Sequence, residues 1–150
     1  MNDNVTMGKL GEQVFLELFG GVQSADEFDK IKDIVLDGRH VEVKAQNRHP
    51  TKHVFAIRDA YVNEKGNIVG VDNIIKCFSV ERLVFVEYDH TSVIKLWECP
   101  LPRKYIKYTT SKQLAMIGFP ISQMKLLISH EDAELANKFR ALSQSKVFKK

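Results

Sequence analysis

Hydrophobic and polar residues alternate most clearly over residues 34–44, on either side of Asp37-Gly38. Asp-Gly is a strong signal for a two-residue turn of type I′, because that turn needs positive φ at both central positions. With this turn, Ile34 faces Val41, and side chains alternate between the two faces of the predicted hairpin. The predicted core face carries Ile34, Leu36, Val41 and Val43. The opposite face carries Asp33, Val35, His40, Glu42 and Lys44.

Apolar spacing also predicts the other elements of the chain. Helical spacing predicts a helix over 6–19, ended by Gly20-Gly21, and a loop over 22–30. Strands are predicted over 53–61 and 68–71 as a second hairpin, and over 82–88, 93–97 and 124–128. The segment 82–88 is apolar on both faces, which is typical of a central strand. Helices are predicted over 71–80, 111–117 and 130–142, the last capped by Ser129. This pattern indicates an α/β fold of the α+β kind, with a mixed central β-sheet flanked by helices.

The composition describes one globular domain over residues 1–150, of which 44% are hydrophobic. No apolar run approaches the roughly 18 residues that cross a bilayer, and the first residues do not resemble a signal peptide. We therefore expect an intracellular protein without a membrane partner. Cys77 and Cys99 are too few and too far apart for a disulfide framework or a zinc site, so we expect two reduced, packed thiols.

Charge is distributed unevenly along the chain, although the net charge is only +3. Residues 1–38 are acidic, whereas residues 39–58 carry five cations against Glu42 alone, and residues 99–130 carry five cations and no acid. Such a division suits an acidic metal pocket next to a surface that binds a polyanion. Ordinary solvated lysines explain any one of these segments equally well.

Asp33 and Glu42 face each other in the predicted hairpin, with Lys44 one step further on the same face. Two carboxylates about 5 Å apart repel by roughly 3 kcal/mol at an effective dielectric near 20, and by about 1 kcal/mol in water. A divalent cation between them would turn this repulsion into binding. The simpler interpretation is a solvated hairpin face on which two acids are opposed by chance.

An acid, a hairpin turn and then Glu-Val-Lys resemble the active-site hairpin of the PD-(D/E)XK nuclease superfamily. The matching positions are Asp33, Glu42 and Lys44; Glu12 on the N-terminal helix and Gln46 agree with the same family pattern. The proline that usually precedes the first acid is missing. The resemblance covers about residues 8–46 and implies a restriction-endonuclease-like core, to which the second hairpin is added.

The resemblance also implies a chemistry, the hydrolysis of phosphodiester bonds with Mg²⁺, for which Mn²⁺ can substitute. Asp33, Glu42 and the backbone carbonyl of Val43 would bind the metal, and Glu12 would bind a second metal or its waters. Lys44 would orient or deprotonate the attacking water, and Gln46 would touch the adjacent phosphate. Hard oxygen ligands of this kind suit Mg²⁺.

The expected partner is double-stranded DNA, held by the cations outside the acidic segment. The candidate DNA-binding residues are Arg39, Arg48, Lys52, Arg58, Arg103, Lys104, Lys107 and Lys112. A chain of this length has one active site, so cutting both strands requires a dimer or a higher even oligomer, such as a tetramer.

Three functions remain open at this point. The first is a site-specific double-strand endonuclease of restriction or homing type, because two hairpins and a basic, tyrosine-bearing segment offer surface for reading a sequence. The second is a Holliday-junction resolvase, and the third is a non-catalytic DNA-binding module, or a subunit of a larger complex, on the same scaffold. The sequence has no glycine-rich phosphate loop, so no nucleotide cofactor is expected.

Overall fold

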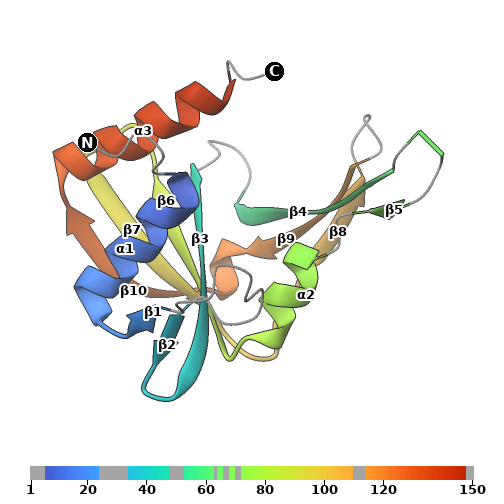
Figure 1. Cartoon of the computed structure of the whole chain (residues 1–150), viewed down its shortest axis with the longest axis horizontal. Helices are drawn as coiled ribbons and strands as arrows, with labels where there is room; N and C mark the ends of the chain where they lie inside the picture. Colours follow the sequence, from blue (N-terminus) through green and yellow to red (C-terminus); the bar gives the residue numbers. More distant parts are fainter. Residues whose placement is uncertain are drawn as a thin grey trace.

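The computed structural model describes residues 6–23, 34–47, 53–62, 64–65, 68–69, 72–109 and 114–147. Within these ranges the protein is an α+β fold of two β-sheets and the helices α1 (Met7–Phe19), α2 (Asp72–Ser79) and α3 (Ala133–Val147). A 3₁₀ turn, η1, spans Ile121–Gln123. Figure 1 shows α1 and α3 beside one sheet, while the other sheet extends away from them. None of the helices in these ranges is long and apolar enough to cross a membrane.

The larger sheet has six strands and is mixed in direction. Its order is β1 (Val22–Gln23), β2 (Ile34–Leu36), β3 (Arg39–Asn47), β6 (Arg82–Tyr88), β7 (Val93–Cys99) and β10 (Lys125–Glu131). Only β3 and β6 pair in parallel, and the other neighbours are antiparallel. The second sheet is antiparallel, in the order β5 (Ile68–Val69), β4 (Val54–Val62), β9 (Leu114–Pro120) and β8 (Ile106–Thr109).

The hairpin of β2 and β3 has the predicted turn and register. Asp37 and Gly38 both have positive φ, at 52° and 76°, as a type I′ turn requires. Ile34 pairs with Val41, Val35 with His40 and Leu36 with Arg39. The predicted core face is therefore confirmed, and Ile34 and Val41 are fully buried.

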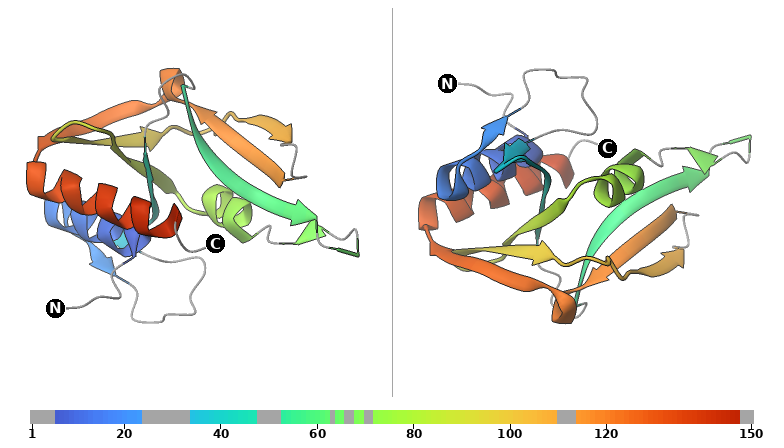
Figure 2. Two further views of the ribbon diagram at one scale, coloured as in Figure 1. Left: turned by 90° about the horizontal axis from the view of Figure 1, so that it is seen from above. Right: turned by 90° about the horizontal axis from the view of Figure 1, so that it is seen from below.

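One face of the six-stranded sheet packs against α1 and α3. Buried apolar side chains of both helices, such as Phe15 and Phe139, meet Val43 and Val86 from the sheet. At Gly11 a Cβ atom would lie only 3.2 Å from Ala45 Cβ, so glycine lets α1 approach β3 closely. Figure 2 shows the two helices side by side on this face.

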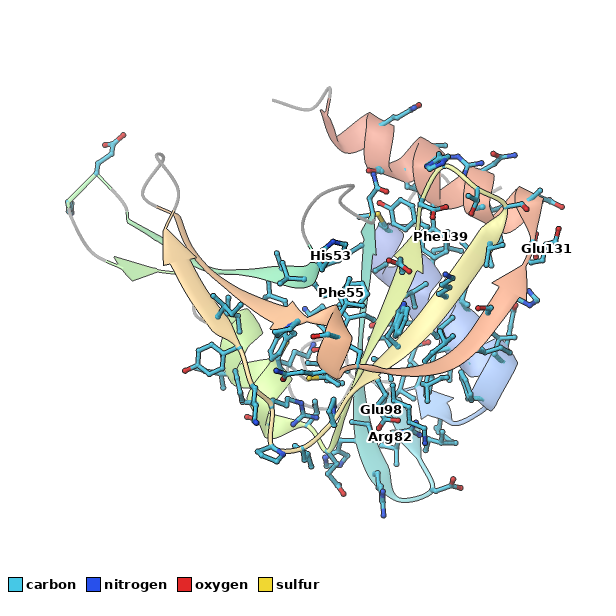
Figure 3. All side chains as sticks on the ribbon, turned by 180° about the vertical axis from the view of Figure 1, so that it is seen from behind. His53, Phe55, Arg82, Glu98, Glu131 and Phe139 are labelled. Atoms are coloured by element: carbon cyan, nitrogen blue, oxygen red, sulfur yellow. The ribbon has the colours of Figure 1, made fainter. Side chains whose placement is uncertain are left out.

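The other face is covered by the second sheet and by α2, which lies in the angle between the two sheets (Figure 2). Phe55 of β4 stacks on Phe85 of β6 with ring centroids 4.6 Å apart. Cys77 and Val80 are buried in the same core. Figure 3 shows Phe55 and Phe139 on opposite sides of the six-stranded sheet. The central strand β6 therefore contributes to both cores, as its apolar sequence predicts.

Several sequence predictions are wrong in detail. Helices were expected on both sides of the sheet; on one side the helix α2 is joined by a second sheet, which was not expected. Val22–Gln23 forms the short strand β1 where a loop was expected. Leu114–Pro120 is a strand where a helix was expected over 111–117, because Ile117 and Phe119 alternate into the second core. Asp132 caps α3 in place of Ser129, since its Oδ1 accepts a hydrogen bond from the Leu135 N–H at 2.9 Å.

The second hairpin forms, with Tyr61 opposite Val69 and Val62 opposite Ile68. However, β4 pairs along most of its length with β9. The pairing runs from Val54 opposite Pro120 to Tyr61 opposite Leu114. The hairpin is therefore part of a sheet that closes the second core, and only its end near β5 extends beyond the body of the molecule in Figure 1.

Candidate active site on the polar face of the hairpin

Alternation along β3 places Glu42, Lys44 and Gln46 on the face that looks towards α2 and the second sheet. Their neighbours Val41 and Val43 are buried in the opposite core with α1. On β6, Glu42 lies beside Leu83 and Lys44 beside Phe85. The polar face predicted for the hairpin therefore borders a hydrophobic core and is not an open surface.

Glu42 is buried, with 2% of its side chain exposed. Its Oε2 atom lies 3.4 Å from Nζ of Lys76, a lysine in the last turn of α2. Burying a carboxylate without a compensating charge is very unfavourable, so this ion pair keeps Glu42 compatible with its position. Lys76 was not predicted as a site residue. The signal for it was the single cation within the otherwise apolar run from Ile74 to Phe78.

Cys77 follows Lys76 and lies in the same part of the molecule. Burial raises the pKa of its thiol to about 12, opposed by the nearby charges of Lys44 and Arg103 and reinforced by that of Glu42. We call Glu42, Lys44, Lys76 and Cys77 the Glu42 cluster. Burial also raises the pKa of Cys99, to about 11. Both cysteines are buried free thiols, as predicted.

Gln46 joins the two sheets. Its Oε1 accepts a hydrogen bond from the Ala56 N–H at 3.0 Å, and its Nε2 donates a hydrogen bond to the Ala56 carbonyl oxygen. The amide therefore pairs with both backbone groups of one residue on β4. This contact gives Gln46 a structural role, whereas its expected contact with a phosphate stays a prediction.

Glu12 lies on α1, which packs against the opposite face of β3 from the one that carries Glu42. Its Oε2 accepts a hydrogen bond from Nε2 of Gln23 at 2.9 Å. The structure does not bring Glu12 and Glu42 onto one face of the sheet. A role for Glu12 at a second metal stays a prediction that this arrangement does not favour.

Asp33 lies outside the described residues, so its place opposite Glu42 stays a prediction. Val43, whose carbonyl was the third expected ligand, is buried on β3 and pairs with Val84 of β6. Among the residues that the structure describes, no group of three His, Cys, Asp or Glu side chains could hold a metal ion. The carboxylate of Glu42 suits a hard cation. The part of the site that can be described is nevertheless incomplete for Mg²⁺, because that carboxylate faces an ammonium group.

Arg82 and Glu98 form a second charged pair, on neighbouring strands of the larger sheet (Figure 3). Nε and Nη2 of Arg82 each donate to an oxygen of Glu98 at 2.9 Å. Such a bidentate pair fixes both side chains. The carboxylate of Glu98 is therefore engaged in a contact within the sheet itself.

The residues predicted to contact DNA differ in how exposed their side chains are. Arg39 and Lys104 are exposed, as a phosphate contact requires. Arg103 is 8% exposed, its Nε and Nη2 atoms have no hydrogen-bond acceptor among the described residues, and burial lowers the pKa of its guanidinium. A contact of Arg103 with DNA stays a prediction, which the burial of its side chain does not favour. Arg48, Lys52 and Lys112 lie outside the described residues, as do the side chains of Arg58 and Lys107.

No protein-family model matches the sequence, and a comparison with curated proteins found no match either.

Proposed function

We propose that this protein is a Mg²⁺-dependent DNA endonuclease that hydrolyses phosphodiester bonds, on a core similar to that of PD-(D/E)XK nucleases. The observation that carries the proposal is the register of β2 and β3. It sets Glu42 and Lys44 on one face of a tight hairpin, and the described part of that hairpin begins directly after Asp33. A Glu-x-Lys sequence that arose by chance would have no reason to coincide with this turn, this register and a buried glutamate.

The side chains have separate roles in this proposal. When bound, Mg²⁺ would supply charge neutralisation at the phosphate and lower the pKa of water. Glu42, Asp33 and the Val43 carbonyl would hold the ion. Lys44, two residues after Glu42 on the same face, would orient the attacking water through its Nζ atom or take up its proton. Gln46 would hold β4 in place beside this face, through its contact with Ala56.

The preferred substrate is duplex DNA, cut at specific sites by an enzyme of restriction or homing type. One active site per chain implies a dimer or tetramer for cutting both strands. Arg39 at the hairpin and Lys104 before β8 are exposed and would contact phosphates. A Holliday-junction resolvase is the alternative, since the same hairpin chemistry would cut at a branched structure.

The Glu42–Lys76 pair favours one further candidate, a non-catalytic DNA-binding module. A buried carboxylate that already has an ammonium partner 3.4 Å away needs no metal to balance its charge. In that case the protein would bind DNA with the same surface but would not cleave it, with or without Mg²⁺.

Incubation of the protein with long duplex DNA and with a four-way junction, each with Mg²⁺, tests the proposal. Discrete duplex fragments support a restriction or homing type, and nicking confined to the junction supports a resolvase. Glu42→Gln or Lys44→Ala should abolish cleavage but leave DNA binding, measured in EDTA, largely unchanged. Lys138→Ala, at an exposed site on α3, is the control and should cut normally. Full activity of either site variant would end the assignment, and DNA binding without cleavage by the unmodified protein would favour the non-catalytic module.

A further inference from the structure

Most of the large apolar side chains that are exposed in the described ranges lie on two segments, α2 and the connection from β7 into β8. They are Ile75, Phe78, Leu101, Tyr105 and Ile106. Phe78 and Tyr105, which are 39% and 42% exposed, bring the two segments together, since their ring centroids lie 5.3 Å apart. Ile75 lies one turn before Phe78 on the same side of α2. We call Ile75, Phe78 and Tyr105 the Tyr105 platform.

The core holds the two exposed rings in place. Phe78 also contacts the fully buried Phe119 of β9, with ring centroids 5.9 Å apart, and Phe119 contacts Phe85 in turn. The ring planes of Phe78 and Tyr105 are inclined by 72°, an edge-to-face contact that leaves ring surface exposed to another planar group. An exposed ring that the core already fixes loses little conformational entropy when a ligand stacks on it.

Charge indicates which kind of partner suits this surface. Lys104 is exposed, and residues 99–130 carry five cations and no acid. Arg103 adds a positive charge beneath the surface, because it is 8% exposed and its Nε and Nη2 atoms have no acceptor among the described residues. Of the acids that flank the two segments, Glu98 is paired with Arg82 and Glu81 is exposed after the end of α2. The Tyr105 platform therefore suits a partner that combines negative charge with flat apolar surfaces.

We propose that the Tyr105 platform binds unpaired bases of single-stranded DNA. A single strand offers base faces that stack on aromatic rings, and phosphates that pair with nearby cations. In a duplex each base face is covered by the neighbouring bases, so a duplex cannot use the rings in this way. The inference goes beyond the proposed function, because it concerns a surface outside the hairpin and requires neither metal nor cleavage.

A second copy of the chain is the other partner that an exposed apolar surface suggests. A symmetric contact would set the same surface of two copies face to face. The Lys104 side chains would then approach one another, and residues 99–130 would supply no acid to separate them. A DNA strand brings the opposite charge and is therefore the better match.

The inference is tested by the binding of a labelled oligothymidylate of about 20 nucleotides to the full-length protein, measured by fluorescence anisotropy in EDTA. Tyr105→Ala should weaken this binding roughly tenfold, because a stacked base is lost, and should weaken binding of a duplex of the same length much less. Tyr105→Phe keeps the ring and should bind within about twofold of the unmodified protein. Val22→Ala, which shortens an exposed apolar side chain in the other sheet, is the matched control. Circular dichroism checks that each variant is folded.

A second measurement needs no variant. Irradiation of the unmodified protein with an oligonucleotide that carries 5-iododeoxyuridine should cross-link the base to Tyr105 or Phe78, which mass spectrometry locates. If Tyr105→Ala does not fold, the position of the cross-link decides alone, and cross-links confined to other residues overturn the inference.

A loss of affinity in Tyr105→Ala that is specific to the single strand, with Tyr105→Phe and Val22→Ala unaffected, supports the inference. Equal single-strand affinity in all variants overturns it, as does an equal loss for single strand and duplex. If Tyr105→Ala abolishes self-association in analytical ultracentrifugation but keeps its single-strand affinity, a second copy occupies the platform and the inference is overturned. Cleavage of duplex DNA with Mg²⁺ by an unmodified protein that binds no single strand overturns the inference alone. Single-strand binding at the platform without any cleavage supports the inference and overturns the proposed function.

Discussion

Gln46 shows how one side chain can serve the fold at a place where a catalytic role was expected. The sequence pattern Glu-x-Lys-x-Gln assigned it to the site, and the structure places its amide on the backbone of Ala56. An amide suits this contact because it offers one donor and one acceptor side by side. Its position on the polar face was predictable from alternation, but its partner on β4 was not, because that contact depends on how the second sheet packs.

Replacing Gln46 with alanine should destabilise the protein by about 1–3 kcal/mol, since both hydrogen bonds to Ala56 are lost. Urea unfolding followed by circular dichroism measures the change. Gln123→Ala, at an exposed position of η1, is the control and should change the stability by less than about 0.5 kcal/mol. If Gln46→Ala unfolds at the same urea concentration as the control, the contact does not join the sheets in solution.

Among the elements, the hairpin of β2 and β3 depends most directly on local sequence. Asp37-Gly38 fixes the turn, and the turn fixes which residues of β3 face α2. Gly38 has φ of 76°, and a Cβ atom there would meet no heavy atom within 4 Å. Any effect of a substitution at Gly38 therefore comes from the backbone conformation and not from a steric clash.

We expect Gly38→Ala to destabilise the protein by about 1 kcal/mol, because a side chain disfavours positive φ. Gly8→Ala is the matched control, since Gly8 lies in α1 and the nearest atom to a new Cβ is Thr6 Oγ1 at 3.9 Å. That change should stabilise the protein by roughly 0.5–1 kcal/mol. Thermal unfolding of both variants measures the difference. A higher midpoint of thermal unfolding in Gly38→Ala would contradict the positive φ assigned to Gly38 in the turn.

The elements also show what a sequence can reveal and what it cannot. The hairpin, α1, α2 and the central strand β6 follow from local periodicity and turn residues, and they were predicted correctly. A helix is predicted over 111–117, whereas β9 forms from Leu114 to Pro120, and an apolar run such as Leu114 to Phe119 fits a buried strand or a buried helix equally well. Only the pairing of β9 with β4 and β8 decides between them. The Glu42–Lys76 pair was missed for the same reason, since it joins elements far apart in the chain.

At the scale of the whole molecule, some cations of the basic segments lie on the surface and others are buried. Arg39 and Lys104 are exposed, whereas Arg103, next to Lys104 in the sequence, is buried. Counting cations along the chain cannot separate these neighbours. Burial decides which of them a polyanion can reach.

The salt dependence of DNA binding should reflect this division. Removing one phosphate contact, by Arg39→Gln or Lys104→Gln, should reduce the slope of log K against log salt concentration by about 1. Arg103→Gln should leave the slope unchanged and alter only the stability of the fold. Fluorescence anisotropy with a labelled duplex over a series of salt concentrations measures the slopes. A reduced slope for Arg103→Gln with a stable fold would show that this side chain reaches DNA after all.

The order of the strands in the two sheets has a consequence for how the protein can be divided. The chain passes from β3 to β4, returns from β5 through α2 to β6, leaves again from β7 to β8, and comes back from β9 to β10. Each sheet is therefore assembled from separate pieces of the polypeptide. A C-terminal truncation at any of the first three crossings would remove strands from both sheets at once, so a shortened version that keeps the hairpin but omits α2 would not retain the environment of Glu42.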